Sequence, residues 1–210
     1  MGLSAERICA DLDALGLIEP RFAQAITQVG YPEPRIREAG YVTLFRTIVG
    51  QQVSFKAANS IWAKLEAGLR ETGLGNIADP QTALKAGEDT LRSYGLSRQK
   101  QSYVLSLAER VADGALPLGN LPNDDEEAIA LLTAVKGIGR WSAEIYLLFA
   151  EGRGDVWPAG DLAVQISVGG LMEMTERPTE RVVRILGEAW RPYRGAAAIF
   201  AWHHYKKQAI

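Results

Sequence analysis

Apolar residues recur at helical spacing along most of the chain. Between residues 44 and 69 the intervals are three, four or seven, which places these residues on one stripe of a helix. The stripe consists of Leu44, Ile48, Phe55, Ala58, Trp62, Leu65 and Leu69. A break in this helix is expected near Gly50 or Gly68. Because the sequence has neither sustained period-two alternation nor an Asn-Gly or Asp-Gly hairpin, it predicts an all-α protein with ten or more helices.

Short polar residues and glycines mark the ends of the expected helices. A side chain that can cap free amides precedes three of them, at Asp79, Ser97 and Asn123, and the helix after Ser97 is expected over 98–112. Glycines follow helical segments, where a left-handed C-cap is expected, at Gly30, Gly73, Gly95 and Gly114. The least helical stretches are residues 31–40, 114–123 and 151–160. The first and last of these stretches are candidates for crossings between two lobes.

Composition narrows the class of protein. With 210 residues and 47% apolar content, the chain can bury a sizeable core without disulfides or a structural metal. Its single cysteine, Cys9, excludes an intramolecular disulfide, a zinc knuckle and a four-cysteine iron–sulfur cluster. No apolar run approaches the ~20 residues of a membrane span, and the N-terminus lacks the pattern of a signal peptide. We therefore expect a soluble, cytoplasmic protein with no membrane partner. The net charge of −2 taken alone argues against a nucleic-acid partner.

Residues 131–150, LLTAVKGIGRWSAEIYLLFA, combine two expected helices with a tight turn. One helix ends near Ala134, a Lys-Gly-Ile-Gly turn follows, and the next helix begins around Arg140 or Trp141. The two glycines allow a sharp turn and leave bare amides at a helix N-terminus, an arrangement that suits a phosphate. The same turn is compatible with an ordinary corner between helices, in which the glycines cap and Ile138 fills the core.

A second candidate for chemistry follows in DVWPAGDLAVQISVGGL. Asp161 comes after Pro158 and Gly160 and before an apolar helical run, which is the position of an N-cap. Most aspartates at such positions only cap a helix. Asp161 also lies about 22 residues after the glycine turn, one helix and one loop away, so the two features can approach the same cleft. Asp155 is the nearest rival carboxylate.

Several segments, taken in order, resemble the helix-hairpin-helix DNA glycosylase superfamily. They are residues 44–62 with Gln-Gln-x-Ser-x-Lys-Ala-Ala, 95–108 with Gly-Leu-Ser-x-x-Lys, the hairpin at 131–150, the Val156-x-Pro-x-x-Asp-x-x-Val164 pattern, and 190–205 with Trp-Arg-Pro-x-Arg. Within the superfamily the pattern is most similar to the bacterial 3-methyladenine DNA glycosylase II group. Too few residues precede position 40 for that group's N-terminal α/β lobe, so the chain resembles a compact, all-helical form.

The resemblance implies a two-lobed helical fold with the active site in the cleft between the lobes. Residues 36–150 would form one lobe, ending in the hairpin at 131–150. Residues 1–35 and 151–210 would form the other. The implied activity is that of a monofunctional DNA glycosylase, which flips a damaged base out of double-stranded DNA and hydrolyses its N-glycosidic bond during base excision repair. Alkylated purines such as 3-methyladenine are the implied substrates, and the enzyme is expected to be a monomer.

The resemblance also implies roles for individual residues. Asp161 would be the catalytic carboxylate, which stabilises the positive charge that develops on the sugar, positions the attacking water, or does both. In relatives that also cut the DNA backbone, the position of Trp141 holds a Schiff-base lysine, so no lyase activity is expected here. The residues expected at the base pocket are Trp141, Trp202, Tyr146 and Gln51.

Further residues are expected to contact DNA or a cation. The hairpin would bind phosphate through Lys136, Gly137, Gly139, Arg140 and Ser142. The loop before residues 98–112 would insert a wedge into the gap left by the flipped nucleotide, with Leu96, Ser97 and Arg98 as the candidates. No cofactor is required, but backbone carbonyls could hold a structural Na⁺ or K⁺ at Thr133, Val135 and Ile138. The adjacent His203 and His204 point in two directions, which favours a surface role over a metal site.

Other functional classes remain open at this stage. They are a glycosylase for deaminated or oxidised bases, a non-catalytic helix-hairpin-helix DNA-binding protein, and a helical protein-interaction module. The last explains neither the hairpin nor the aspartate spacing. The net charge of −2 then limits nonspecific phosphate neutralisation rather than excluding DNA. A locally basic face is expected from Lys56, Lys100, Lys136, Arg140, Arg191 and Arg194.

Overall fold

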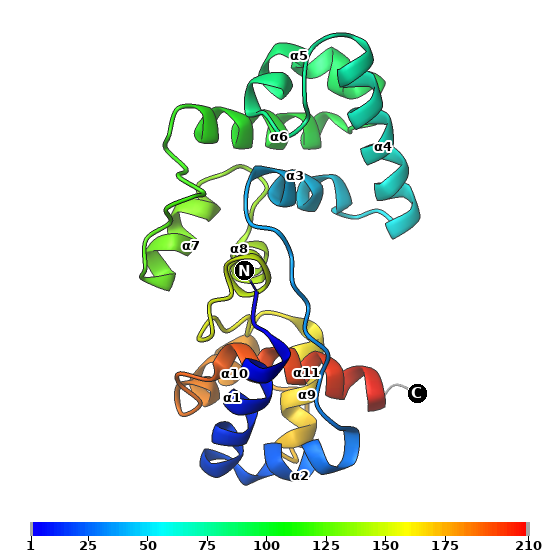
Figure 1. Cartoon of the computed structure of the whole chain (residues 1–210). Coiled ribbons are helices and arrows are strands. Elements are labelled where there is room, and N and C mark those ends of the chain that lie inside the picture. The colour runs from blue at the N-terminus through cyan, green and yellow to red at the C-terminus, as the bar shows by residue number, and fades with distance from the viewer. Residues whose placement is uncertain (1, 209–210) are drawn as a thin grey trace. The chain divides into compact units, whose positions relative to one another are not determined.

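A computed structural model describes residues 2–208 and confirms the predicted fold class. Within these residues the chain forms eleven α-helices and one π-helical turn, and no strand (Figure 1). The helices are α1 (Ala5–Ile18), α2 (Pro20–Val29), α3 (Tyr41–Gly50), α4 (Phe55–Glu71), α5 (Pro80–Ser93), α6 (Arg98–Ala112), α7 (Asp125–Thr133), α8 (Arg140–Tyr146), α9 (Leu162–Leu171), α10 (Glu180–Glu188) and α11 (Arg194–Gln208), and the π-helical turn η1 is Leu147–Glu151. No helix in the described part of the chain is long and apolar enough to cross a membrane.

The chain divides into two compact units. The central unit comprises Glu38–Tyr146, and the terminal unit comprises Met1–Arg37 together with Leu147–Ile210. The central unit holds α3 to α8, and the terminal unit holds α1, α2, η1 and α9 to α11 (Figure 1). Each unit has its own hydrophobic core.

The central unit is built around α3, which packs against α4, α6 and α8. Leu44 and Ile48 of the predicted apolar stripe are fully buried in α3, whereas Phe55, also placed on that stripe, is 82% exposed. The expected break near Gly50 is confirmed, because α3 ends there and Ser54 caps the next helix by accepting the amide of Ala57. There is no break at Gly68.

Two of the three predicted N-caps are confirmed and one is wrong. The side chain of Asp79 accepts the amide of Gln81 at the start of α5, and Ser97 caps α6, whose bounds match the predicted segment. The cap of α7 is Asp124, which accepts the amide of Glu127, and not Asn123. A run of polar residues offers several caps, and spacing alone does not select among them.

The terminal unit packs α11 against α9, α1 and α2 around an aromatic cluster. Phe22 lies edge-on to Trp190 with ring centroids 5.1 Å apart, and Trp190 lies edge-on to Trp157 at 5.3 Å. The indole nitrogen of Trp157 donates to the carbonyl of Val183 in α10, at 3.0 Å. Trp157 belongs to the loop that leads into Asp161 and α9. Its contacts with Val183 and Trp190 hold this loop against α10 and against the segment that precedes α11.

Candidate active site and nucleic-acid interface

Asp161 is the N-cap of α9 in the terminal unit, as predicted. Its Oδ1 accepts hydrogen bonds from the amides of Ala163 and Val164, at 2.9 and 3.1 Å. The same oxygen accepts a third bond, 3.0 Å long, from the indole Nε1 of Trp202 in α11. Three donors on one oxygen fix the orientation of the carboxylate. Asp161 is half-buried, so part of the residue is accessible to solvent. The structure thus brings together two residues that were predicted separately, 41 positions apart.

Trp202 is held from its other side by an aromatic residue of the π-helical turn. The ring of Phe149 lies 5.5 Å from the ring of Trp202, at an interplanar angle of 37°. The backbone carbonyl of Phe149 accepts the amide of Arg37, which ties η1 to the segment after α2. π-Helical turns occur often at functional sites. Here the turn supports the indole that donates to Asp161.

Two exposed apolar residues follow Asp161 and were missed in the sequence. Leu162 is 54% exposed and Ile166 is 36% exposed, although the rest of α9 is largely buried. They lie four positions apart and therefore share one face of the helix. An apolar pair at this spacing directly after the candidate aspartate is the signal that could have identified them. The face offers an apolar surface beside the carboxylate.

Asp155 is engaged in an ion-pair network. It accepts from Arg191 at 2.6 Å and from Arg194 at 2.9 Å, and Glu188 binds both arginines. The side chain of Arg194 is only 9% exposed. Hydrogen bonding to Arg191 lowers the pKa of Glu188. The expectation that Arg194 contributes to a basic face is wrong, because its side chain is buried and paired with Asp155 and Glu188, whereas Arg191 is paired but half exposed.

The turn of the predicted hairpin lies in the central unit between the expected helix ends, whereas residues 147–150 of the predicted segment form part of η1 in the terminal unit. α7 ends at Thr133 and α8 begins at Arg140. Gly137 has a φ of +81°, and a Cβ at this position would lie 2.1 Å from the ring of Tyr103. Only glycine therefore fits this turn. Gln51, which was expected at the base pocket, donates from Nε2 to the carbonyl of Gly137 at 2.8 Å and so fastens the turn to the loop after α3.

A hollow of about 310 Å³ opens where three predicted segments of the central unit meet. It is lined by Gln51, Gln52, Val53, Ser97, Gln99, Lys100, Tyr103 and Gly137. Lys100 donates to the carbonyl of Val49 at 2.7 Å, and its partial burial lowers its pKa. Gln52 was not identified from the sequence, although it lies on the rim and has a φ of +53°, a conformation that non-glycine residues rarely adopt.

The other predicted DNA-binding residues have different surroundings. Ser97, Arg98, Lys136 and Gly139 are exposed, and Ser142 is half-exposed. Leu96 is only 3% exposed, which is incompatible with a wedge that inserts into DNA, so this prediction is wrong and Ser97 and Arg98 remain.

Two predicted base-pocket residues differ in exposure. Tyr146 is only 3% exposed, and its hydroxyl accepts the amide of Gly40 at 2.7 Å. Its assignment to the base pocket stays a prediction. Trp141 is 48% exposed and presents an indole at the surface.

The histidine pair also differs from the expectation. His204 is buried, with Nδ1 2.9 Å from Oγ of Ser167 and Nε2 2.9 Å from Nε2 of Gln208. The amide of Gln208 donates to Nε2, so Nδ1 carries the proton and donates to Ser167. Burial lowers the pKa of His204. The predicted surface role is wrong for His204, because the helix buries the face on which it lies.

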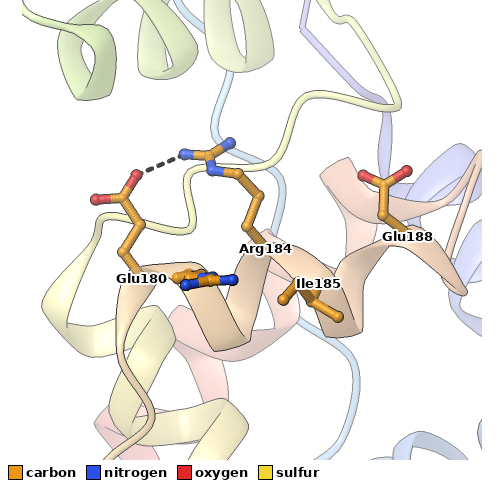
Figure 2. Close-up of a pocket in the computed structure, with 5 residues that line it drawn as sticks. Glu180, Arg184, Ile185 and Glu188 are labelled. Atoms are coloured by element: carbon orange, nitrogen blue, oxygen red, sulfur yellow. Dashed lines mark hydrogen bonds and ion pairs between the residues drawn. The ribbon is translucent and has the colours of Figure 1, made fainter.

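A second hollow, of about 530 Å³, lies along α10 (Figure 2). Figure 2 shows the ion pair between Glu180 and Arg184, whose atoms are 2.8 Å apart, with Ile185 and Glu188 further along the helix. A Cβ on Gly160 would lie 3.2 Å from the carboxylate of Glu180, so the start of α10 borders the loop that leads into Asp161. The lining side chains all come from α10, and we assign this hollow no part in the chemistry.

Metal ligands of the side-chain type are not clustered in the described residues: no group of three or more His, Cys, Asp or Glu could hold an ion. The carbonyls expected to hold Na⁺ or K⁺ belong to Thr133, Val135 and Ile138 and are of a suitable chemical type. The carbonyl of Val135 accepts the amide of Ile138 at 3.1 Å. Arg110 donates to the neighbouring carbonyl of Ala134 at 3.2 Å, which already supplies a positive charge there.

Comparison with known proteins adds independent information. The family model of the HhH-GPD superfamily of base excision DNA repair proteins matches residues 45–192. DNA-3-methyladenine glycosylase 1 of Schizosaccharomyces pombe is 32% identical over 164 residues, which cover 77% of this chain and 71% of that protein. A DNA-3-methyladenine glycosidase structure from Bacillus halodurans matches with a TM-score of 0.84 and 28% identity, covering 95% of this chain and 90% of that one. The S. pombe 3-methyladenine DNA glycosylase in complex with abasic DNA matches with a TM-score of 0.72 and 27% identity, covering 96% and 97%.

Proposed function

The chain belongs to the HhH-GPD superfamily of base excision DNA repair proteins, and from this premise we propose that it is a DNA glycosylase that excises alkylated bases, with 3-methyladenine as the model substrate. The similar proteins are named for that lesion. The observation that carries the proposal is Asp161, whose carboxylate is held in a fixed orientation by two amides and an indole. The enzyme would act as a monomer on double-stranded DNA in the cytoplasm.

The proposed reaction is hydrolysis of the N-glycosidic bond of a flipped nucleotide. As that bond breaks, its electron pair leaves with the base and positive charge develops at C1′ of the sugar. The carboxylate of Asp161 would stabilise this charge, and water then supplies the oxygen that bonds to C1′. A base alkylated at a ring nitrogen is already cationic and leaves as a neutral molecule. This chemistry needs one carboxylate and no separate strong acid, which agrees with the commitment of Asp155 to Arg191 and Arg194.

Aromatic faces are proposed to select the base. An electron-poor alkylated purine is attracted to an indole π-face. Trp202 is half-exposed beside Asp161 in the terminal unit, and Trp141 is 48% exposed in the central unit. The exposed Leu162 and Ile166 would add apolar contact next to the carboxylate.

The hairpin of the central unit is proposed to bind the DNA backbone. Gly137 and Gly139 would present amides to a phosphate, with Lys136 and Ser142 as supporting contacts. Gln52 and Ser97, which line the adjoining hollow, and the exposed Arg98 next to Ser97 would contact DNA near the flipped nucleotide. A Na⁺ or K⁺ ion at the carbonyls of residues 133, 135 and 138 would add positive charge to the hairpin, while the hydrolysis itself uses no cofactor.

A panel of lesions tests the proposed substrate class. Duplexes that contain 3-methyladenine, hypoxanthine or an oxidised purine are incubated with the protein, and abasic sites are detected by alkaline cleavage. We expect release of 3-methyladenine to be the fastest. Faster release of hypoxanthine or an oxidised purine would assign the protein to another lesion class. DNA binding without release of any base would favour a non-catalytic DNA-binding protein.

The absence of lyase activity is a separate prediction. Schiff-base chemistry needs an amine nucleophile, and the position after Arg140 holds the indole of Trp141. Borohydride added during turnover should therefore trap no covalent protein–DNA adduct on a denaturing gel, while base release proceeds. An adduct that forms in proportion to turnover would contradict the monofunctional assignment.

A further inference from the structure

The guanidinium of Arg140 is held by two glutamates of the central unit. Its Nη1 lies 2.8 Å from Oε2 of Glu126, and its Nη2 donates to the other oxygen of the same carboxylate. Its Nε donates to Oε1 of Glu144 at 2.9 Å. These bonds, with that to Glu126 first, raise the pKa of Arg140. The residue expected to bind a DNA phosphate is thus already occupied by a carboxylate in the DNA-free protein.

The two glutamates differ in how replaceable they are. Glu144 lies one turn further along α8, and its side chain is 2% exposed. Glu126 belongs to the first turn of α7, lies 14 positions before Arg140, and its side chain is 68% exposed. An exposed ion pair is weak and screened by salt, whereas a buried partner cannot leave without an unpaired charge. Glu144 is therefore the permanent partner, and Glu126 is the one that can be exchanged.

The bond between Arg140 and Glu126 has the geometry that a phosphodiester would adopt. Two parallel N–H···O bonds join a planar guanidinium to the two oxygens of one anion, and guanidinium binds carboxylate and phosphate in the same bidentate way. A DNA phosphate also presents two non-bridging oxygens and one negative charge. It can take the place of the Glu126 carboxylate and accept from the same Nη1 and Nη2 donors of Arg140.

We propose that Glu126 is a built-in competitor for the DNA phosphate that binds Arg140. This inference rests on the proposed function in one respect, namely that the hairpin meets DNA. In the DNA-free protein the carboxylate of Glu126 accepts from both Nη1 and Nη2 of Arg140. On binding, a phosphate displaces it, and Glu126 turns into solvent. This competition lowers the affinity for any duplex. The protein therefore dissociates from undamaged DNA faster than it would without the carboxylate of Glu126.

The test measures the affinity of the full chain for an undamaged duplex by fluorescence anisotropy at two salt concentrations. Glu126→Gln removes the competing charge and keeps the shape of the side chain, so we expect binding about threefold tighter or more. The matched control is Glu127→Gln, which changes the net charge equally at the next position, and it should change affinity much less. Arg140→Gln should weaken binding and reduce the salt dependence.

A double variant isolates the interaction. In the Arg140→Gln background, Glu126→Gln should give no more gain than Glu127→Gln gives. The proposal is overturned if Glu126→Gln binds no tighter than Glu127→Gln, or if its gain persists without Arg140. Melting temperatures confirm that each variant is folded. Base release by the wild-type protein is measured in parallel, so a failure of the glycosylase assignment is seen separately from a failure of the competitor.

Discussion

Two aspartates in the same stretch of the terminal unit have different surroundings. Asp155 accepts from two guanidinium groups and has become part of a structural network. Oδ1 of Asp161 accepts from two backbone amides and one indole, all of them neutral donors. A carboxylate that two arginines bind, such as Asp155, would stabilise a developing cation poorly.

At the residue scale, the bond between Trp202 and Asp161 predicts a positioning effect. Trp202→Phe keeps an aromatic ring against Phe149 but removes the Nε1 donor. We expect the maximal rate of base release to fall about tenfold with little change in KM, because a hydrogen bond to a charged group is lost.

Trp190→Phe is the matched control for that variant, since Trp190 packs on Phe22 and Trp157 in the same unit. It should lower the melting temperature and leave the rate per folded molecule unchanged. An unchanged rate for Trp202→Phe would show that the indole does not position the carboxylate.

Residue patterns predicted some of the site and not the rest. The N-cap position of Asp161 and the caps at Asp79 and Ser97 follow from local sequence, since a cap depends on its nearest neighbours. The burial of Leu96, Tyr146 and His204 does not follow, because tertiary packing decides which face of a helix is covered. The pairing of Arg140 with Glu126 joins separate helices and is likewise beyond any local pattern.

At the element scale, the hairpin depends on one glycine more than on the other. Gly137→Ala would place a methyl group in the left-handed region and against the ring of Tyr103. The left-handed conformation alone costs about 1–2 kcal/mol, and the steric overlap adds to it. We expect a lower free energy of unfolding in urea and weaker binding to duplex DNA.

Gly139→Ala serves as the comparison, because no atom lies within 4 Å of the added Cβ and the φ of Gly139 is not positive. It should cost clearly less stability than Gly137→Ala. Equal losses in the two variants would contradict the assigned turn geometry.

The pairing of α9 with α11 predicts a pH dependence of stability. His204 joins the two helices through Ser167, and its folded-state pKa lies below its ordinary value of 6.5. The unfolded chain therefore takes up the proton first as the pH falls below about 6.5. The stabilisation is complete above that pH and is lost progressively below it.

Thermal unfolding between pH 7.5 and 5 checks this expectation. His204→Gln should flatten the acid side of the profile of melting temperature against pH. His203→Gln should keep most of the pH dependence of the wild-type protein. A profile of His204→Gln with the same slope as the wild-type profile would contradict the assignment.

The elements themselves were largely predictable, for a physical reason. α6 has the predicted bounds, and the hairpin helices end and begin where expected, because glycine and polar caps act locally. The choice between Gly50 and Gly68 was not predictable. The ring of Tyr94 lies where a Cβ of Gly68 would be, so this glycine allows close packing inside an unbroken helix.

At the scale of the whole molecule, a net charge of −2 limits how much binding free energy the protein gains from the negative charge of DNA. Arg140, Arg191 and Arg194 each bind carboxylates. Such a protein gains little from nonspecific neutralisation of phosphates. It must rely on hairpin amides and on contacts made only at a lesion, so we expect it to discriminate damaged from undamaged DNA mainly through the flipped base.

The central claim is that Asp161 is the catalytic carboxylate, and single-turnover release of 3-methyladenine by Asp161→Asn tests it most directly. Asparagine is also a good N-cap and can accept the same bonds at Oδ1, so the variant should fold and bind DNA as the wild type does. The variant loses the negative charge and carries an NH2 donor in place of Oδ2. We predict that base release slows about a hundredfold or more at an unchanged melting temperature. Release at the wild-type rate by the folded variant would contradict the account.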